Sequence, residues 1–203
     1  SSGITAAARY LPIAASHLAT DATAVTDLRL PVVPPVVDDV VYLPRAVSLP
    51  AADALVVADL HIGRREASDV EYPIGERRDL LERLRRLLTA ADPETAVFAG
   101  DVLHRFDAVT ERARETVADL LAACDDAECD TALVRGNHDG GAAARIESGE
   151  VESDAGGGDR ITVTDSGGVR LGRVGFAHGH TWPARAVVES DVLCVGHEHP
   201  AVR

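Results

Sequence analysis

The sequence contains no lysine, no methionine and few aromatic residues. All 20 basic side chains are therefore arginines, and 33 acidic side chains outnumber them, for a formal net charge of −13. This charge disfavours broad electrostatic capture of nucleic acid, although a local arginine patch could still bind it. Because only 3% of the residues are aromatic, no large base-stacking platform is expected. The acidic excess predicts a salt-adapted, halophilic protein; an ordinary acidic mesophilic protein is the alternative.

Other absences narrow the class of protein further. The three cysteines, Cys124, Cys129 and Cys194, lack the paired spacing of a metal-binding motif, so we expect buried thiols. No run reaches the roughly 18 apolar residues of a membrane span, and the N-terminus lacks the pattern of a signal peptide. These absences predict a cytoplasmic protein with no membrane partner. Methionine is missing even at position 1, from which we expect the sequence to be a fragment.

The chain divides into two regions by composition. Residues 1–38 are rich in Ala, Ser and Thr and end near three prolines, which predicts an N-terminal extension that is loose or adds one accessory strand. Residues 39–203 should form the folded domain. Apolar runs predict strands at 53–58, 95–99, 131–135 and 191–195, and helical spacing predicts helices at 75–91 and 110–124. This alternation is typical of parallel βαβ units in an α/β fold.

The region between residues 140 and 177 has a different pattern. Residues 140–159 are small, acidic and Gly-rich, which predicts a loop. The segments 160–164 and 169–177 flank the sequence DSGG, which is a turn signal, so we expect them to pair as a hairpin.

Polar residues of metal-ligand type follow five of the predicted strands. They stand in the segments Asp59–His61, Gly100–Asp101, Gly136–Asp139, His178–His180 and Gly196–His199. Open α/β sheets place their sites at the carboxyl ends of strands. A single such residue usually belongs to a turn or cap, but ligand types at five successive strand ends predict a joint metal site. The mixture of nitrogen and oxygen donors suits Mn, Fe, Zn, Ni or Co better than Ca.

The supply of ligands exceeds what one ion needs. The candidates are Asp59, His61, Asp101, Asn137, His178, His197 and His199. A carboxylate can bridge two cations about 3.5–4 Å apart, which together activate a shared water and clamp the oxygens of a phosphoryl group. The pattern therefore predicts hydrolysis of phosphate esters. A structural zinc site would require a closed and usually Cys-rich ligand set, which is absent from the sequence.

In this order, from about residue 53 to 200, the five motifs resemble those of calcineurin-like metallophosphoesterases. The resemblance implies a four-layer α/β/β/α sandwich with two divalent ions, for which we expect Mn, and a metal-bridging hydroxide as nucleophile. By motif, it assigns one ion to Asp59, His61 and His199, the second ion to Asn137, His178 and His197, and the bridging position to Asp101. It also implies that His138 is a general acid and that Asp139 orients His138 by a hydrogen bond.

A narrower resemblance rests on the segments LVVADLHIGRRE, GDVLH, HGHTWP and GHEHPA. They are similar to the DNA-ligase-associated metallophosphoesterases and their archaeal relatives. This implies a phosphodiesterase acting on nucleic-acid or nucleotide esters, and an association with the DNA ligase and helicase machinery. Relatives continue beyond the position of His199 with strands that complete the second sheet, so we expect such C-terminal strands to be missing here. The alternatives are a phosphomonoesterase and a catalytically silent scaffold, although the full set of ligand types favours an enzyme.

Several residues near the motifs remain open between a functional and a structural role. Arg64 would bind substrate phosphate or form a surface salt bridge with Glu66 or Glu71. His104 and His180 would line the substrate site or cap a loop. Trp182 is expected to pack in the fold. The arginines of the helix at 75–91 are expected on its solvated face; they are Arg77, Arg78, Arg83, Arg85 and Arg86.

Overall fold

The computed structural model describes residues 9–12, 40–64, 76–104, 109–139 and 160–197. Its larger sheet has the strand order β2-β3-β4-β5-β6-β7. The strands are β2 (Val41–Leu43), β3 (Ala46–Leu49), β4 (Ala54–Val57), β5 (Thr95–Ala99), β6 (Asp130–Val134) and β7 (Ile161–Thr164). Strands β4 to β7 are parallel neighbours, whereas β2, β3 and β4 pair antiparallel. A short 3-10 helix, Pro50–Ala52, joins β3 to β4.

The smaller sheet has the strand order β1-β10-β9-β8. These strands are β1 (Arg9–Pro12), β8 (Val169–Leu171), β9 (Val174–Ala177) and β10 (Val192–Val195). β1, β10 and β9 run parallel, and β8 is antiparallel to β9. β1 lies within the N-terminal extension predicted at 1–38; the rest of that extension falls outside the described residues.

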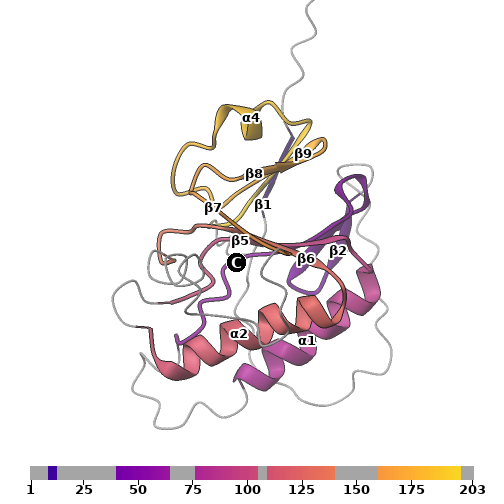
Figure 1. The fold of residues 1–203 in the computed structure, drawn as a ribbon. Coiled ribbons are helices and arrows are strands. Elements are labelled where there is room, and N and C mark those ends of the chain that lie inside the picture. The colour runs from indigo at the N-terminus through magenta and orange to yellow at the C-terminus, as the bar shows by residue number, and fades with distance from the viewer. Residues whose placement is uncertain (1–8, 13–39, 65–75, 105–108, 140–159, 198–203) are drawn as a thin grey trace, which may run out of the picture.

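Helices and sheets stack in four layers (Figure 1). The helices α1 (Glu76–Ala91) and α2 (Glu111–Asp126) cover one face of the larger sheet, and the smaller sheet packs on the other. The one-turn helix α4 (Arg185–Val188) lies against β8 and β9. This arrangement agrees with the α/β/β/α class predicted from the motifs. None of the helices in the described ranges is long and apolar enough to cross a membrane.

Successive side chains of the central strands point to opposite faces of the larger sheet, and a hydrophobic core lies on each face. Leu55 and Phe98 point toward the buried leucines of α1 and α2, while Val56 and Val97 point toward Phe176 of the smaller sheet. All three cysteines are buried and unpaired, as predicted. The strand ends between the two cores are therefore held rigidly, which is a requirement for positioning ligand side chains.

The predicted hairpin of 160–164 and 169–177 is wrong. β7 pairs with β6 in the larger sheet, whereas β8 and β9 pair with each other in the smaller sheet. The turn after β7, closed by a hydrogen bond from Gly168 N to Asp165 O (3.1 Å), carries the chain from one sheet to the other. A local turn signal does not specify which strands pair, so sequence alone could not distinguish these two arrangements.

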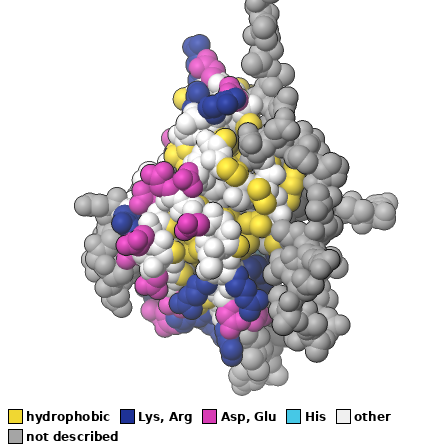
Figure 2. Space-filling view, turned by 90° about the vertical axis from the view of Figure 1, so that its right-hand side faces the viewer, with side chains coloured by type: hydrophobic (Ala, Val, Ile, Leu, Met, Phe, Trp, Pro, Cys, Tyr) yellow, Lys and Arg dark blue, Asp and Glu magenta, His cyan; other side chains and the backbone are white. Residues whose placement is uncertain are grey.

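Arginines on the outer helix surface are mostly neutralised by nearby acids. Arg78 pairs with Glu82 at 2.8 Å, and Arg77 reaches from α1 to Asp119 on α2 at 2.6 Å. Figure 2 shows basic and acidic side chains side by side on the lower part of the molecule, where Figure 1 places the helices. Arg83 departs from the solvated face predicted for it, because it is partly buried and lines a cavity.

Candidate metal centre

The loops after β4 and β5 run side by side and are tied by backbone hydrogen bonds. Asp59 N donates to Gly100 O at 3.0 Å, and His61 N donates to Asp101 O at 2.9 Å. The pairing continues as a short parallel bridge between Ile62 and Leu103. Two predicted ligand segments that are 42 residues apart at Asp59 and Asp101 therefore lie in register at one edge of the sheet.

Four of the predicted ligands have left-handed backbone conformations. Their φ angles are 54° at Asp59, 47° at His61, 50° at Asp101 and 64° at His197. Such conformations are uncommon for residues other than glycine and cost roughly 1–2 kcal/mol each. They concentrate at functional sites, where the surrounding fold enforces them. Here they turn each chain sharply after its strand and so redirect the side chain toward the centre.

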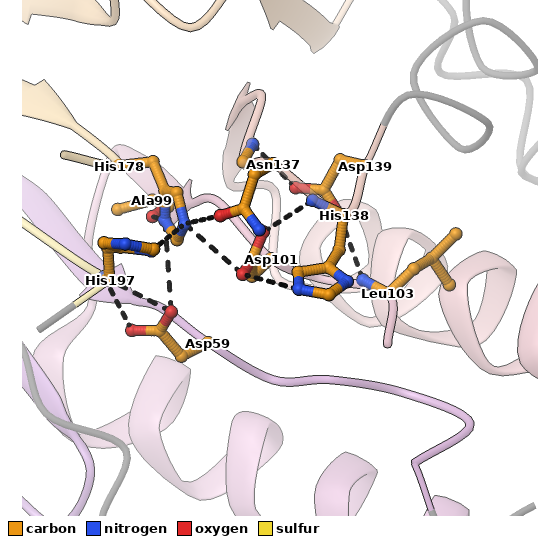
Figure 3. A network of polar contacts seen from close by, with 10 residues as sticks. Asp59, Ala99, Asp101, Leu103, Asn137, His138, Asp139, His178 and His197 are labelled. Atoms are coloured by element: carbon orange, nitrogen blue, oxygen red, sulfur yellow. Dashed lines mark hydrogen bonds and ion pairs between the residues drawn. The ribbon is translucent and has the colours of Figure 1, made fainter. Parts of the chain in front are cut away.

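His178 occupies the middle of the polar network (Figure 3). Its side chain is completely buried, with Nδ1 3.0 Å from Ala99 O. Its Nε2 lies 3.1 Å from Asn137 Oδ1, 3.3 Å from Asp101 Oδ2 and 3.2 Å from His197 Nδ1. When Nδ1–H donates to the Ala99 carbonyl and Nε2 carries no proton, several lone pairs converge on one point. That geometry fits a cation.

Convergent donors form two groups that share one residue. The donor atoms of Asp101, His178 and His197 lie within 4.8 Å of one another, as do those of Asp59, His61 and Asp101. Asp59 and Asp101 are almost completely buried, at 3% and 2% exposed, and buried carboxylates require compensating charge. The two donor groups therefore fit the binding of a metal cation, and they have Asp101 in common. The seventh predicted ligand, His199, lies outside the described residues.

Protons compensate part of this charge in the metal-free chain. Burial alone would raise the pKa of Asp101, but hydrogen bonds from His178 and from the His138 backbone N–H lower it to about 2. Burial would lower the pKa of His178, but the adjacent Asp101 carboxylate raises it overall. A cation that binds to Nε2 of His178 would compete with a proton for that atom.

His104 and His180, whose roles the sequence left open, lie beside the expected ligands. The His104 ring stacks on His138 with centroids 6.0 Å apart, and both rings lie edge-on to His61. His180 lies 5.2 Å from His178 by ring centroids, and burial lowers its pKa. Nδ1 of His180 is buried without a hydrogen-bond partner among the described residues. Both histidines border the expected ligands, and their contact with substrate stays a prediction.

Asp139 has different partners from those predicted. Its carboxylate, completely buried, accepts hydrogen bonds from Leu103 N at 3.0 Å and Gly136 N at 2.9 Å. Burial raises its pKa despite these bonds. Within the described part of the chain, no hydrogen bond joins it to the His138 ring. Asp139 thus links the loops after β5 and β6, and positions His138 only through the backbone of its own loop.

Glycines in the motifs have a role that the sequence analysis did not assign. A Cβ atom at Gly136 would collide with Asp101, and one at Gly100 would lie 2.5 Å from the His178 ring. Gly100 also has a φ of +85°. The available signal was that a glycine directly precedes Asp101, Asn137 and His197. A second signal is that Asn137 is the only asparagine in a chain without glutamine.

Two further residues lie near the centre in the sequence. Arg64 is exposed and its backbone N donates to His61 O at 3.1 Å, while its suggested partners Glu66 and Glu71 fall outside the described residues. Trp182 is 91% exposed, so the expectation that it packs in the fold is wrong. Its segment is anchored through the Ala184 backbone N–H, which bonds to Gly167 O at 2.8 Å. A surface loop held by its backbone does not require the indole to be buried.

Known protein families and solved structures include two that resemble this chain. The model of the calcineurin-like phosphoesterase family matches residues 53–189. Among solved structures, the nuclease MPE of Pseudomonas putida is similar, with 28% identity and a TM-score of 0.48, over 75% of this chain and 64% of that chain. The chain thus spans less than two thirds of the length of that nuclease. No curated protein matches the sequence.

The family match extends over more than half of the chain, including the loops after β4, β5, β6 and β9. The matching model describes the whole family and does not distinguish its subgroups. The resemblance to the DNA-ligase-associated subgroup therefore stays a prediction. The matched loops carry the carboxylate and imidazole groups that converge around Asp101. The chain therefore belongs to the calcineurin-like phosphoesterase family.

Proposed function

We propose that this protein hydrolyses phosphodiesters of nucleic acids or nucleotides at a centre of two divalent cations. The seven ligands would be Asp59, His61, Asp101, Asn137, His178, His197 and His199. The observation that carries the proposal is the shared position of Asp101, which belongs to both groups of convergent donors. The segments LVVADLHIGRRE and HGHTWP support diesters, because they resemble the DNA-ligase-associated subgroup.

In this reaction, the oxygen of a water forms a bond to phosphorus while the bond from phosphorus to the leaving oxygen breaks. The products are a phosphomonoester and an alcohol, which takes up one proton. When bound, the two cations lower the pKa of a shared water and neutralise charge on the phosphoryl oxygens. Mn is the expected metal, and Fe, Zn, Ni and Co suit the same nitrogen and oxygen donors.

Side chains of the protein position the substrate and move the proton. The Ala99 carbonyl accepts from Nδ1 of His178 and so directs Nε2 of His178 toward the centre. His138 is partly exposed, and its Nε2 is 3.9 Å from Asp101 Oδ2, which places its ring at the boundary between the carboxylates and solvent. From there, a ring N–H of His138 would donate to the leaving oxygen.

Paired chromogenic substrates test this function. Metal-free protein is given Mn and then bis(4-nitrophenyl) phosphate or 4-nitrophenyl phosphate, and bound Mn is counted by elemental analysis. We expect Mn-dependent turnover with the diester favoured, and two ions per chain. Preferred hydrolysis of the monoester would contradict the substrate class. Full activity with one ion per chain would contradict the paired centre.

A further inference from the structure

A cavity with a volume of about 230 Å³ adjoins the candidate metal centre on the helix side of the larger sheet. Asp59 and His61 form part of its wall, so the cavity and the centre share residues. Its inner wall is apolar and consists of Leu84, Leu87, Phe98 and Leu120, all of them buried. Five arginines complete the lining: Arg45, Arg64, Arg77, Arg83 and Arg112. We refer to it as the arginine cavity.

The lining of the arginine cavity contains more arginines than carboxylates, whereas acidic residues outnumber basic ones in the whole protein. The chain carries a net charge of −13, yet these five arginines face only two carboxylates in the lining, Asp59 and Asp79. Asp59 already accepts hydrogen bonds from the backbone N–H of His197, at 3.1 and 3.3 Å. Arg77 pairs with Glu115 and Asp119, which lie outside the lining. Arginines nevertheless outnumber carboxylates in the lining, and the guanidinium group of Arg83 is the one best placed to bind an anion.

Arg83 is the arginine whose environment most requires such an anion. It is partly buried, and within the described residues its guanidinium makes no hydrogen bond or ion pair. Burial lowers the pKa of Arg83 and repulsion from Arg45 lowers it further, while attraction to Asp79 offsets part of this effect. Arg45 is held at this place by the turn between β2 and β3, where its φ is 62°. A partly desolvated guanidinium group without a hydrogen-bond acceptor is a favourable place for a phosphate oxygen.

We propose that the arginine cavity binds a phosphate group of the substrate other than the one that is cleaved. This inference rests on the proposed function, because it takes the scissile phosphate to lie at the metal centre. Arginine suits phosphate, which it can bind through two parallel hydrogen bonds. The apolar inner wall would receive the sugar attached to that phosphate. A volume of about 230 Å³ is below the usual ~300–1,000 Å³ of ligand pockets, so it suits one phosphate and its sugar rather than a longer strand.

Equilibrium binding tests the cavity without hydrolysis. Thymidine 3′,5′-bisphosphate is titrated by calorimetry into the metal-free full chain in EDTA, for the wild type, Arg83→Gln and Arg85→Gln. Arg85 is exposed on α1 and outside the cavity, so its variant controls for the change in total charge. We expect Arg83→Gln to raise Kd about tenfold, the loss of one charge-assisted hydrogen bond, and Arg85→Gln to leave it nearly unchanged. Absence of binding by the wild type, or one Kd for all three proteins, would overturn the proposal.

Thermal unfolding of the same proteins separates binding from a structural role. Because Arg83 is partly desolvated and repelled by Arg45, Arg83→Gln should keep or raise the Tm of the metal-free chain. A variant that lost both Tm and affinity would instead assign Arg83 to the fold and overturn the proposal.

Hydrolysis of dinucleotides then links the cavity to the reaction. The substrates are dithymidine dinucleotides without a terminal phosphate and with one at the 5′ or the 3′ end. The wild type should prefer one phosphorylated form, and Arg83→Gln should reduce this preference in kcat/KM about tenfold. An equal loss on all three substrates would overturn the proposal. If the wild type cleaves no diester at all, the proposed function fails, whereas the binding titration still decides the cavity.

Discussion

The candidate metal centre and the arginine cavity lie side by side and have opposite chemistry. In the centre, the carboxylates of Asp59 and Asp101 are buried among imidazoles, and their donor atoms converge. In the cavity, guanidinium groups surround an apolar wall, and Arg83 is attracted by Asp79 but makes no hydrogen bond or ion pair with another described residue. Carboxylate and imidazole groups therefore predominate in the centre, and guanidinium groups predominate in the lining of the cavity.

This difference teaches how an acidic protein can bind an anionic substrate. Long-range attraction is weak for a chain with a net charge of −13. Affinity must therefore come from short-range contacts: cations held by the carboxylates on one side, and guanidinium groups on the other. The loop after β4 connects the two regions, because its residues Asp59 and His61 belong to both.

The largest effect is expected from Asp101→Ala. Mutating a residue that hydrogen-bonds to a metal ligand typically costs about 10–100-fold in metal affinity or activity. Loss of the shared carboxylate itself should therefore reduce turnover by more than about a hundredfold. Bound Mn should fall as well, whereas bisphosphate binding in EDTA should persist. Asp126→Ala, on the exposed end of α2, is the matched control. Normal metal content and activity in Asp101→Ala would defeat the assignment of the centre.

The next effect is expected from His138→Ala. Loss of a general acid typically costs about 10²–10⁴-fold in kcat, and Mn content should stay near normal because His138 is not an expected ligand. The loss should be smaller with bis(4-nitrophenyl) phosphate than with a dinucleotide, since nitrophenolate leaves without a proton. Equal losses on the two substrates would argue against proton donation by His138.

A smaller effect on stability is expected from Gly100→Ala. Its methyl group would collide with the His178 ring at a φ of +85°, for a loss of about 1–3 kcal/mol in the free energy of unfolding and a loss of Mn affinity. Gly172→Ala is the matched control, because Gly172 also has a positive φ (+54°) but its Cβ would meet only Ala51 O, at 4.0 Å. Chemical denaturation of both variants gives the comparison. Similar losses in the two would show that the close approach to His178 is unimportant.

The pH dependence of the metal-free chain should reflect the Asp101–His178 pair. Asp101 has a pKa lowered to about 2, so its contribution to stability is present above its unfolded pKa near 3.9 and is lost as pH falls toward 2. His178 has a raised pKa, so its contribution is complete below about pH 6.5 and is lost as pH rises through the raised pKa. Thermal unfolding in EDTA across this range should show both losses. Asp101→Asn should flatten the profile; an unchanged profile would contradict the pairing.

The affinity for Mn should depend on pH in the opposite direction to the Asp101–His178 pairing. Because the cation competes with the proton on His178, affinity should rise with pH, and binding near neutral pH should release protons. Calorimetry in buffers of different ionisation enthalpy measures that release. Binding without proton release would place the cation elsewhere.

Much of the fold could be predicted because its signals are local. The helical spacing of leucines predicted a helix at 75–91, and the structure has α1 at Glu76–Ala91. The apolar run TAVFA predicted a strand at 95–99, which is β5. The hairpin at 160–177 failed because strand pairing depends on distant partners: β7 pairs with β6. The loop predicted at 140–159 lies outside the described residues.

The candidate site could likewise be predicted only where its signals are local. The motifs indicated which residue types follow each strand, and the structure brings six of the seven expected ligands together around His178 and Asp101. The partners of Asp139 and the burial of Arg83 could not be predicted. Asp139 contacts Leu103, 36 residues away, and Arg83 is repelled by Arg45 from another element of the fold.

By itself, the sequence determined the chemistry available at each strand end, because strands, turns and ligand types are specified by neighbouring residues. Only the tertiary structure decided how these groups share space. It placed Asp101 in both donor groups, directed Asp139 toward the backbone and enclosed Arg83 beside Arg45. The physical reason is that burial and electrostatic coupling depend on which distant segments pack together, and this packing is a property of the whole fold.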